Sequence, residues 1–241
     1  MGAVFARGLL RLGHPLYPVT RSTDMQELAA ALPDPELVLV AVAEKDLQPT
    51  LERIPQSWKA RLALLQNELL PQDWSALAEP TVISVWFEKK RGMDSKVIIP
   101  SPAFGPKAQL LADALAAIAI SARVLADANE LLFELVVKNI YILTSNIAGL
   151  RTGGTVGELW EQHRDFARQV AEEVIVIQEA LTGDRLDRER LIAAMVRAFQ
   201  ADPAHQCMGR SAPARLARAL EHGEHYGLEL PTLHALQHET P

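Results

Sequence analysis

MGAVFARGLLRLGHPLYPVTR, residues 1–21, is the stretch from which the fold of the whole chain is interpreted. Its apolar residues recur at helical spacing, which predicts one amphipathic helix over residues 2–12, ending at Gly13. The apolar run Leu16–Val19 then predicts a short strand, and Arg21 closes it. A glycine, a helix and a strand that ends in a basic residue are typical of the second half of a dinucleotide-binding βαβ unit.

Two residues of this half-motif are candidate cofactor ligands. Gly2 would let the helix pack close to the sheet, and the helix N-terminus would hold a pyrophosphate. Arg21 suits a 2′-phosphate, which favours NADP (NADPH) as the cofactor. An ordinary amphipathic helix followed by a strand explains the same residues equally well.

The first half of the motif, a strand and two further glycines, does not precede Gly2. In such sheets that strand is central, so without it the neighbouring strands should be left unpaired. We therefore expect either that Met1 is an internal residue of a longer reading frame or that this copy of the motif is degenerate.

Length and composition indicate a globular protein of one large domain or two modest ones, since 49% of its 241 residues are hydrophobic. The net charge of −6 argues against a nucleic-acid partner. One cysteine, Cys207, excludes an internal disulfide and fits the reducing cytoplasm, and we expect its thiol to be inert. With no signal peptide and no apolar run long enough to span a bilayer, we expect a cytoplasmic protein without a membrane partner.

The pattern along the chain changes near residue 125. Before it, strands and helices alternate, which indicates an α/β domain over residues 1–124. Strands are predicted at 36–43, 61–66, 81–87, 96–99 and 122–125, helices at 24–32, 48–53 and 107–120, and a proline-rich loop at 100–106. After it, long helical periods predict an all-α domain over residues 125–241. Its helices are predicted at 127–150, 157–182, 187–200, 212–226 and 231–238.

The helix at 127–150 carries the strongest candidate for chemistry. Glu134, Lys138 and Asn146 share one of its faces, in a stretch that is otherwise almost wholly apolar. From spacing alone, a surface ion pair between Glu134 and Lys138 is the simpler interpretation. In the functional interpretation, Lys138 polarises or protonates a substrate carbonyl and Asn146 holds a neighbouring oxygen.

Three further polar features have both a structural and a functional interpretation. Asn67 follows the strand at 61–66, at the sheet edge where ligands bind, but an asparagine there is also a common turn residue. Lys45 follows the strand at 36–43 and is most simply a solvated loop residue. His234 and His238 share a helix face, but no third ligand is suggested, so we predict no metal site.

Taken together, these segments resemble the ketopantoate reductases (2-dehydropantoate 2-reductases), NADPH-dependent enzymes of pantothenate synthesis. Residues 1–21 look like the family's stretch from its third fingerprint glycine to its NADP-selecting arginine. LLQN, ending at Asn67, is similar to the strand that borders nicotinamide and substrate. VII with the later Gly-Pro at 105–106, the helix ELVVKNIYILTSNIAGL with the following GEL, and YGLELP at 226–231 match further family segments.

The resemblance implies a fold and a set of roles. It implies a Rossmann-like domain of the 6-phosphogluconate-dehydrogenase-like type at 1–124, lacking its first strand, and a helical substrate and dimerisation domain at 125–241, with the active site in the cleft between them. On that match Lys138 is the catalytic lysine, Asn146 and Asn67 bind substrate, and Gly2, Arg21 and Asn67 bind the cofactor. A homodimer is compatible with the apolar helices of the second domain.

Four departures from the family pattern bear on activity. Glu68 replaces the glycine after Asn67, Ile142 replaces an asparagine one turn after the lysine, Ala43 stands where a lysine is usual, and no glutamate occurs near Ser211. We therefore expect an NADPH-dependent reductase of a ketopantoate-like 2-keto acid. The alternative is a catalytically inactive relative that serves as a binding or interaction module.

Overall fold

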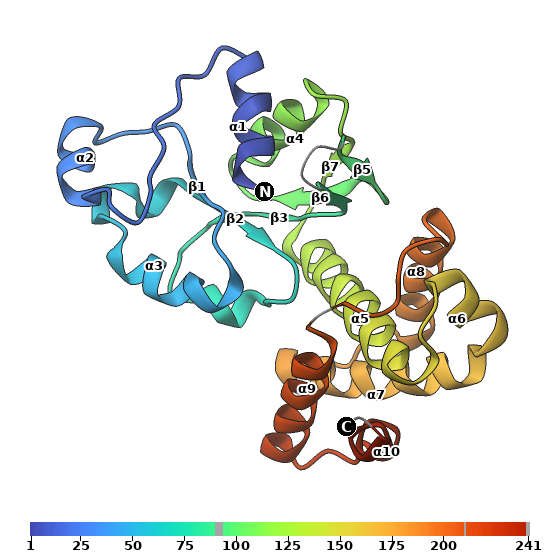
Figure 1. Ribbon diagram of the computed structural model, residues 1–241. Coiled ribbons are helices and arrows are strands. Elements are labelled where there is room, and N and C mark those ends of the chain that lie inside the picture. The colour runs from blue at the N-terminus through green and yellow to red at the C-terminus, as the bar shows by residue number, and fades with distance from the viewer. Residues whose placement is uncertain (90–93, 210, 240–241) are drawn as a thin grey trace. The chain divides into compact units, whose positions relative to one another are not determined.

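The chain is described from a computed structural model that covers residues 1–89, 94–209 and 211–239. It divides into two compact units, Met1–Leu135 and Val136–Pro241 (Figure 1). The division falls inside helix α5 (Ala128–Thr152), whereas the sequence placed the domain boundary at 124/125, before this helix. The difference arises because the first turns of α5 pack with the first unit before the helix continues into the second.

The first unit contains a five-stranded sheet in the order β1-β2-β3-β6-β7. Its strands are β1 (Val38–Val40), β2 (Leu62–Gln66), β3 (Thr81–Ser84), β6 (Ser101–Phe104) and β7 (Ala122–Val124). β1, β2 and β3 are parallel, β6 runs antiparallel to β3, and β7 is parallel to β6. Helices α1 (Gly2–Arg11) and α4 (Ala108–Ala116) lie on one side of the sheet and α3 (Leu47–Arg53) on the other (Figure 1). This is the α/β class that the sequence predicts.

Shorter elements complete the first unit. They are α2 (Met25–Ala31), the 3₁₀ turns η1 (Glu44–Asp46), η2 (Gln56–Arg61) and η3 (Pro71–Trp74), and the two-stranded β4 (Phe87–Glu88) and β5 (Lys96–Val97). The predicted strand at 81–87 is thus divided between β3 and β4, and residues 90–93 lie outside the described residues.

The core of the first unit is built by α1 and α4 against the sheet. Phe5, Leu111 and Leu115 are fully buried there, next to Ile83 of β3. The two helices approach closely at Gly8, where a Cβ atom would lie 2.0 Å from the carbonyl oxygen of Ala114. A side chain at this position would push the helix backbones apart.

Gly8→Ala should therefore destabilise the protein, although glycine to alanine in an open helix is usually stabilising. Overpacking of a tight core contact costs about 2 kcal/mol, and this outweighs the helix-propensity gain of roughly 1 kcal/mol. Urea unfolding of the full chain measures the difference, with the exposed neighbour Arg7→Ala as control. A Gly8→Ala variant as stable as the wild type would show that the α1–α4 contact is not close-packed.

Two sequence predictions for the first unit are wrong. Residues 16–19 form no strand, and Tyr17 and Val19 are 58% and 46% exposed. A strand needs a hydrogen-bonded neighbour, and in the described sheet β1 is an edge strand whose partner is β2, not residues 16–19. The loop predicted at 100–106 contains β6, where Pro102 is tolerated because the pairing with β3 begins at the next residue.

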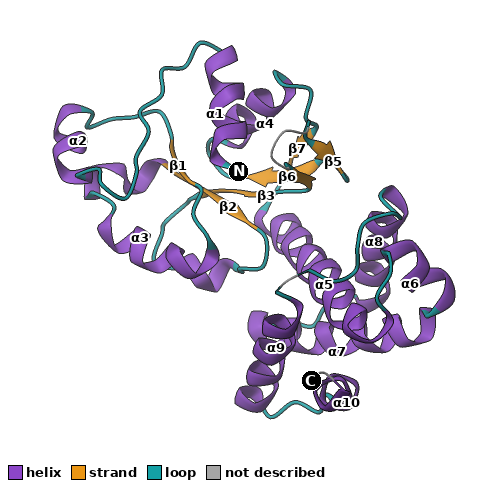
Figure 2. Cartoon of the chain, viewed as in Figure 1, coloured by secondary structure: helices purple, strands orange, loops and turns teal. Residues whose placement is uncertain are grey.

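The described residues of the second unit form helices and connecting loops, with no strand (Figure 2). After α5 come α6 (Val156–Gln162), α7 (Arg164–Thr182), α8 (Arg188–Ala201), α9 (Ala212–Tyr226) and α10 (Pro231–Glu239). The single helix predicted at 157–182 is interrupted at His163, and the other helices match the predictions within two residues. Local signals explain the ends: Thr155 and Glu158 form a capping box for α6, and Gly183 ends α7 with a φ of 74°.

Helix α5 is the core helix of the second unit. The Tyr141 and Phe199 rings lie 5.3 Å apart between α5 and α8, and Asn139 donates to Gln178 of α7 at 2.7 Å. By length and composition α5 could cross a membrane, with a window of mean hydropathy 1.4, so the expectation that no run is long enough is corrected. However, 72% of that window is buried within the protein, which is typical of a core helix.

Candidate functional site

Gly2 begins α1 at the carboxyl end of β1. A Cβ atom on Gly2 would lie 3.3 Å from the Cβ of Ala41, which follows β1 directly. Met1, the N-cap residue, makes no side-chain capping bond. The helix start is therefore packed as closely against the strand end as the sequence predicts for a glycine at this position.

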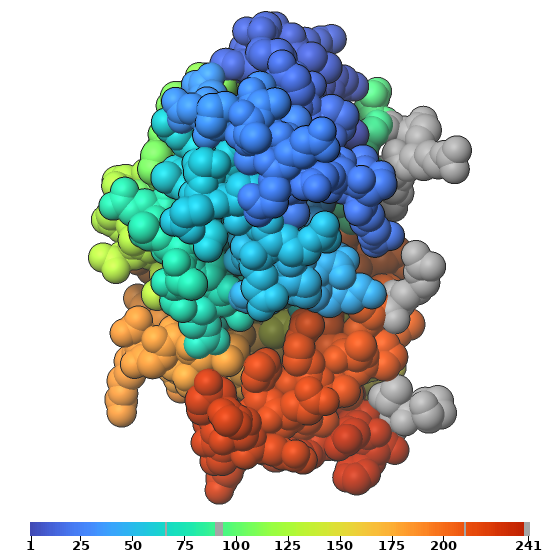
Figure 3. Space-filling model, turned by 90° about the vertical axis from the view of Figure 1, so that its left-hand side faces the viewer, coloured from blue at the N-terminus to red at the C-terminus, as the bar shows by residue number. Residues whose placement is uncertain are grey.

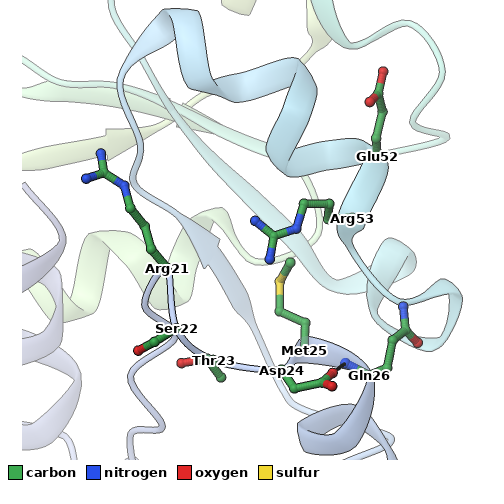
Figure 4. Close-up of a pocket in the computed structure, with 8 residues that line it drawn as sticks. All are labelled: Arg21, Ser22, Thr23, Asp24, Met25, Gln26, Glu52 and Arg53. Atoms are coloured by element: carbon green, nitrogen blue, oxygen red, sulfur yellow. Dashed lines mark hydrogen bonds between the residues drawn. The ribbon is translucent and has the colours of Figure 1, made fainter.

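Arg21 lines a pocket of about 510 Å³ within the first unit. It lies in an exposed turn, not at a strand end, and the opposite wall is formed by Glu52 and Arg53 of α3. Figure 4 shows Arg53 extending from α3 above Met25 towards the side on which Arg21 stands. Both chain segments reach the surface on the face shown in Figure 3, so a solute could enter. Sequence reasoning missed Arg53, since no local pattern relates it to Arg21.

The pocket is lined by two guanidinium groups and two carboxylates, so its formal charge is balanced and the placement of these groups matters. Asp24 caps α2, its carboxylate accepting hydrogen bonds from the backbone N–H groups of Gln26 at 2.9 Å and Glu27 at 3.2 Å. The carboxylate of Glu52 is turned away from both arginines in Figure 4. Two exposed cations from separate segments thus face one solvent-filled space, which is the arrangement that binds a phosphate dianion.

Asn67 lies in an exposed bend that follows β2, at the carboxyl edge of the parallel strands. Lys45 is exposed in η1, as expected for a solvated loop lysine. A small cavity of about 10 Å³ lies at this edge between Val40, Leu47 and Leu65, and it has room for no more than one water molecule. Both interpretations of Asn67, as a turn residue and as a ligand of substrate and cofactor, are compatible with its place.

Lys138 is buried in the second unit, with 7% of its surface exposed. Its Nζ lies 5.7 Å from the centre of the Tyr141 ring, one turn further along α5. Glu134, the carboxylate of the expected surface pair, contacts Nη2 of Arg123 on β7 at 2.5 Å. Lys138 is therefore no surface residue, and a buried lysine on an apolar helix face is rare without a specific role.

Asn146 uses its amide within the second unit. Its Nδ2 donates to the carbonyl oxygen of Ile142 at 2.9 Å. Its Oδ1 accepts from the backbone N–H of Gly209 at 3.2 Å and from Nη1 of Arg215 at 3.0 Å. Asn146 thus holds a loop and the first turn of α9, and it brings Arg215, a residue that sequence reasoning missed, to the α5 face that carries Lys138.

The remaining chemical candidates are one buried cysteine and two exposed histidines. Cys207 is fully buried, and burial together with the charge of Glu158 raises its thiol pKa to about 11, so the thiol is protonated near neutrality. His234 and His238 are exposed on α10. Across residues 1–89, 94–209 and 211–239, no three His, Cys, Asp or Glu side chains are grouped as a metal site would need.

No family model matches the sequence, and no curated protein is similar to it in sequence. Solved structures do share its fold. The 2-dehydropantoate 2-reductase of Methylococcus capsulatus matches with a TM-score of 0.67 and 13% identity, over 99% of this chain and 92% of that one. The enzyme of the same name from Porphyromonas gingivalis W83 matches with a TM-score of 0.64 and 13% identity, over 99% and 94%.

A D-mandelate dehydrogenase, solved with NADH and anilino(oxo)acetate, matches more distantly. Its TM-score is 0.55 at 13% identity, over 85% of this chain and 75% of that one. At such identities the similarity shows the fold: a Rossmann-like α/β part followed by a helical part. It is the fold of the family that the sequence segments resemble.

Proposed function

We propose that this protein reduces a 2-keto acid to the 2-hydroxy acid with NADPH. The observation that carries the proposal is the burial of the cationic side chain of Lys138 on an apolar face of α5. Proteins of the same fold include 2-dehydropantoate 2-reductases and a dehydrogenase solved with NADH and an oxo acid, which supports a ketopantoate-like substrate. Residues 1–124 would bind the cofactor and residues 125–241 would supply the substrate-binding groups.

The residues of the first unit fit NADPH at two points. Arg21 and Arg53 would hold the 2′-phosphate in the pocket between them, and this favours NADPH over NADH. Gly2 and the N-terminus of α1 would lie against the pyrophosphate. When bound, NADPH supplies a hydride to the keto carbon.

Lys138 acts on the keto oxygen in this proposal. Its ammonium group donates a hydrogen bond to that oxygen, stabilises the negative charge that develops there and transfers a proton to form the hydroxyl. Low exposure strengthens this interaction because fewer water molecules compete with the substrate for the ammonium protons. Asn67 would orient substrate and nicotinamide.

The test is oxidation of NADPH by the purified protein with ketopantoate and a panel of other 2-keto acids. We expect turnover with at least one of them, and a lower kcat/KM with NADH than with NADPH. Nicotinamide absorbance follows the reaction, with protein-free and substrate-free controls. If no 2-keto acid is reduced with either cofactor, the reductase proposal is wrong, and the alternative of a catalytically inactive binding module is supported.

A further inference from the structure

The pocket between Arg21 and Arg53 also contains hydroxyl groups. Ser22 and Thr23, the two residues that follow Arg21, line it together with the two guanidinium groups (Figure 4). Both arginines are exposed, and no hydrogen bond or ion pair engages either guanidinium group within the part of the chain that the structure describes. The pocket therefore offers a ligand both positive charge and neutral O–H donors.

Three hydroxyl groups of this turn are joined by hydrogen bonds. The backbone N–H of Thr20 donates to Oγ1 of Thr23 at 2.9 Å. Oγ1 of Thr20 lies 3.2 Å from Oγ1 of Thr23 and 3.0 Å from Oγ of Ser22. Because each hydroxyl has one proton, the two contacts between the hydroxyls use two of their three protons, and one proton is left for a ligand.

The proton that is left belongs to Ser22. A hydroxyl that accepts a hydrogen bond becomes a stronger donor, so Thr23, which accepts from the backbone, donates to Thr20. Thr20 in turn donates to Oγ of Ser22, and the O–H of Ser22 remains available. Ser22 lines the pocket and Thr20 does not, so the chain of hydroxyls ends at the solvent-filled space.

We propose that Ser22 donates a hydrogen bond to the 2′-phosphate of NADPH and thereby contributes to the choice of NADPH over NADH. This role rests on the proposed function, in which Arg21 and Arg53 hold that phosphate. A phosphate group has three acceptor oxygens, so it can bind two guanidinium groups and one hydroxyl together. Thr20 is then a positioning residue, because its hydroxyl contacts Ser22 but lies outside the pocket lining.

Ser22→Ala should weaken binding of 2′,5′-ADP by about 10- to 100-fold, since one hydrogen bond to a charged group is lost. Binding of 5′-AMP, which has no 2′-phosphate, should stay unchanged. Ser22→Thr keeps the hydroxyl and should keep most of the affinity. Ser75→Ala removes an exposed serine outside the pocket and is the matched control. Calorimetry measures all four affinities without catalysis.

Two further readouts separate a donor from a residue that only shapes the turn. Thr20→Val has the shape of threonine without its hydroxyl and should lose part of the 2′,5′-ADP affinity, which Thr20→Ser should restore. The loss in Ser22→Ala should be similar at low and high salt, because the serine is neutral. The loss in Arg53→Ala should shrink at high salt, where the attraction between exposed charges is screened.

The outcomes distinguish this role from the proposed function. If the wild type prefers 2′,5′-ADP to 5′-AMP and Ser22→Ala keeps the full preference, the role of Ser22 is wrong and the NADPH proposal stands. If the wild type binds the two nucleotides alike, both are wrong. If no 2-keto acid is reduced but Ser22→Ala loses a preference that Ser22→Thr keeps, the reductase proposal is wrong and the phosphate site stands.

Discussion

Replacing Lys138 with alanine should lower kcat for 2-keto acid reduction by about 10²- to 10⁴-fold, the usual contribution of a positioned general acid. The effect follows from the loss of the ammonium group that would stabilise and protonate the keto oxygen. KM for NADPH should change little, because the residues proposed to bind the cofactor belong to the first unit. Steady-state rates with saturating NADPH measure the loss.

Lys138→Met separates chemistry from packing. Methionine keeps an unbranched apolar chain in the buried position, so the fold should survive while the proton donor is lost. Lys45→Ala removes an exposed lysine of η1 and should keep wild-type activity. Wild-type rates in both Lys138 variants would remove this residue from the mechanism.

The double variant Arg21→Ala/Arg53→Ala should reduce the preference for NADPH over NADH by about 10²- to 10⁴-fold. Each lost charge-assisted hydrogen bond to the 2′-phosphate contributes about 1.5–3 kcal/mol, and NADH has no group in this place. The single variants should each show part of the loss. The ratio of kcat/KM for the two cofactors is the measurement.

Binding of nucleotide fragments tests the same pocket without catalysis. 2′,5′-ADP should bind the wild type more tightly than 5′-AMP, and the double variant should bind the two alike. Arg7→Ala, which removes an exposed arginine of α1 outside the pocket, should keep the difference. If Arg53→Ala alone leaves 2′,5′-ADP affinity unchanged, this arginine does not contact the phosphate.

The helices of the second unit could be predicted from sequence because their signals are local. α9 begins and ends where its apolar period and turn residues indicate, with Gly227 at a φ of 62° after its last residue. The β-branched run Val174–Ile177 is part of α7, and the long helical period around it predicts a helix there in spite of its strand-like composition. Only the break at His163 was missed.

Strands were harder to predict because they depend on neighbours distant in sequence. Residues 16–19 have the composition of a strand, but no strand of the described sheet pairs with them, and Tyr17 and Val19 are exposed. Residues 101–104 include a proline, which favours a loop, yet they pair with β3 on one side and β7 on the other. The amino-acid composition of a segment does not show whether another strand lies beside it.

The residues of the candidate site also differ in whether local sequence marks them. The sequence marks Lys138 as a candidate because a lysine interrupts an apolar helical stretch. That its side chain is buried is seen only in the structure. Arg53 and Arg215 could not be found, since the first meets Arg21 only across a pocket and the second meets Asn146 across 69 residues of chain. The roles of Gly2, Arg21, Asn67, Lys138 and Asn146 in binding or catalysis remain predictions.

Transfer of deuterium from NADPH that carries deuterium in place of both hydrogens at C4 of the nicotinamide tests the reductase proposal most directly. With ketopantoate or the best 2-keto acid of the panel, mass spectrometry should find the 2-hydroxy acid with one deuterium at C2, in amounts equal to the NADPH oxidised. The Lys138→Met protein should form the same product far more slowly. NADPH oxidation without a deuterated hydroxy acid, or no oxidation at all, would contradict a hydride-transferring reductase.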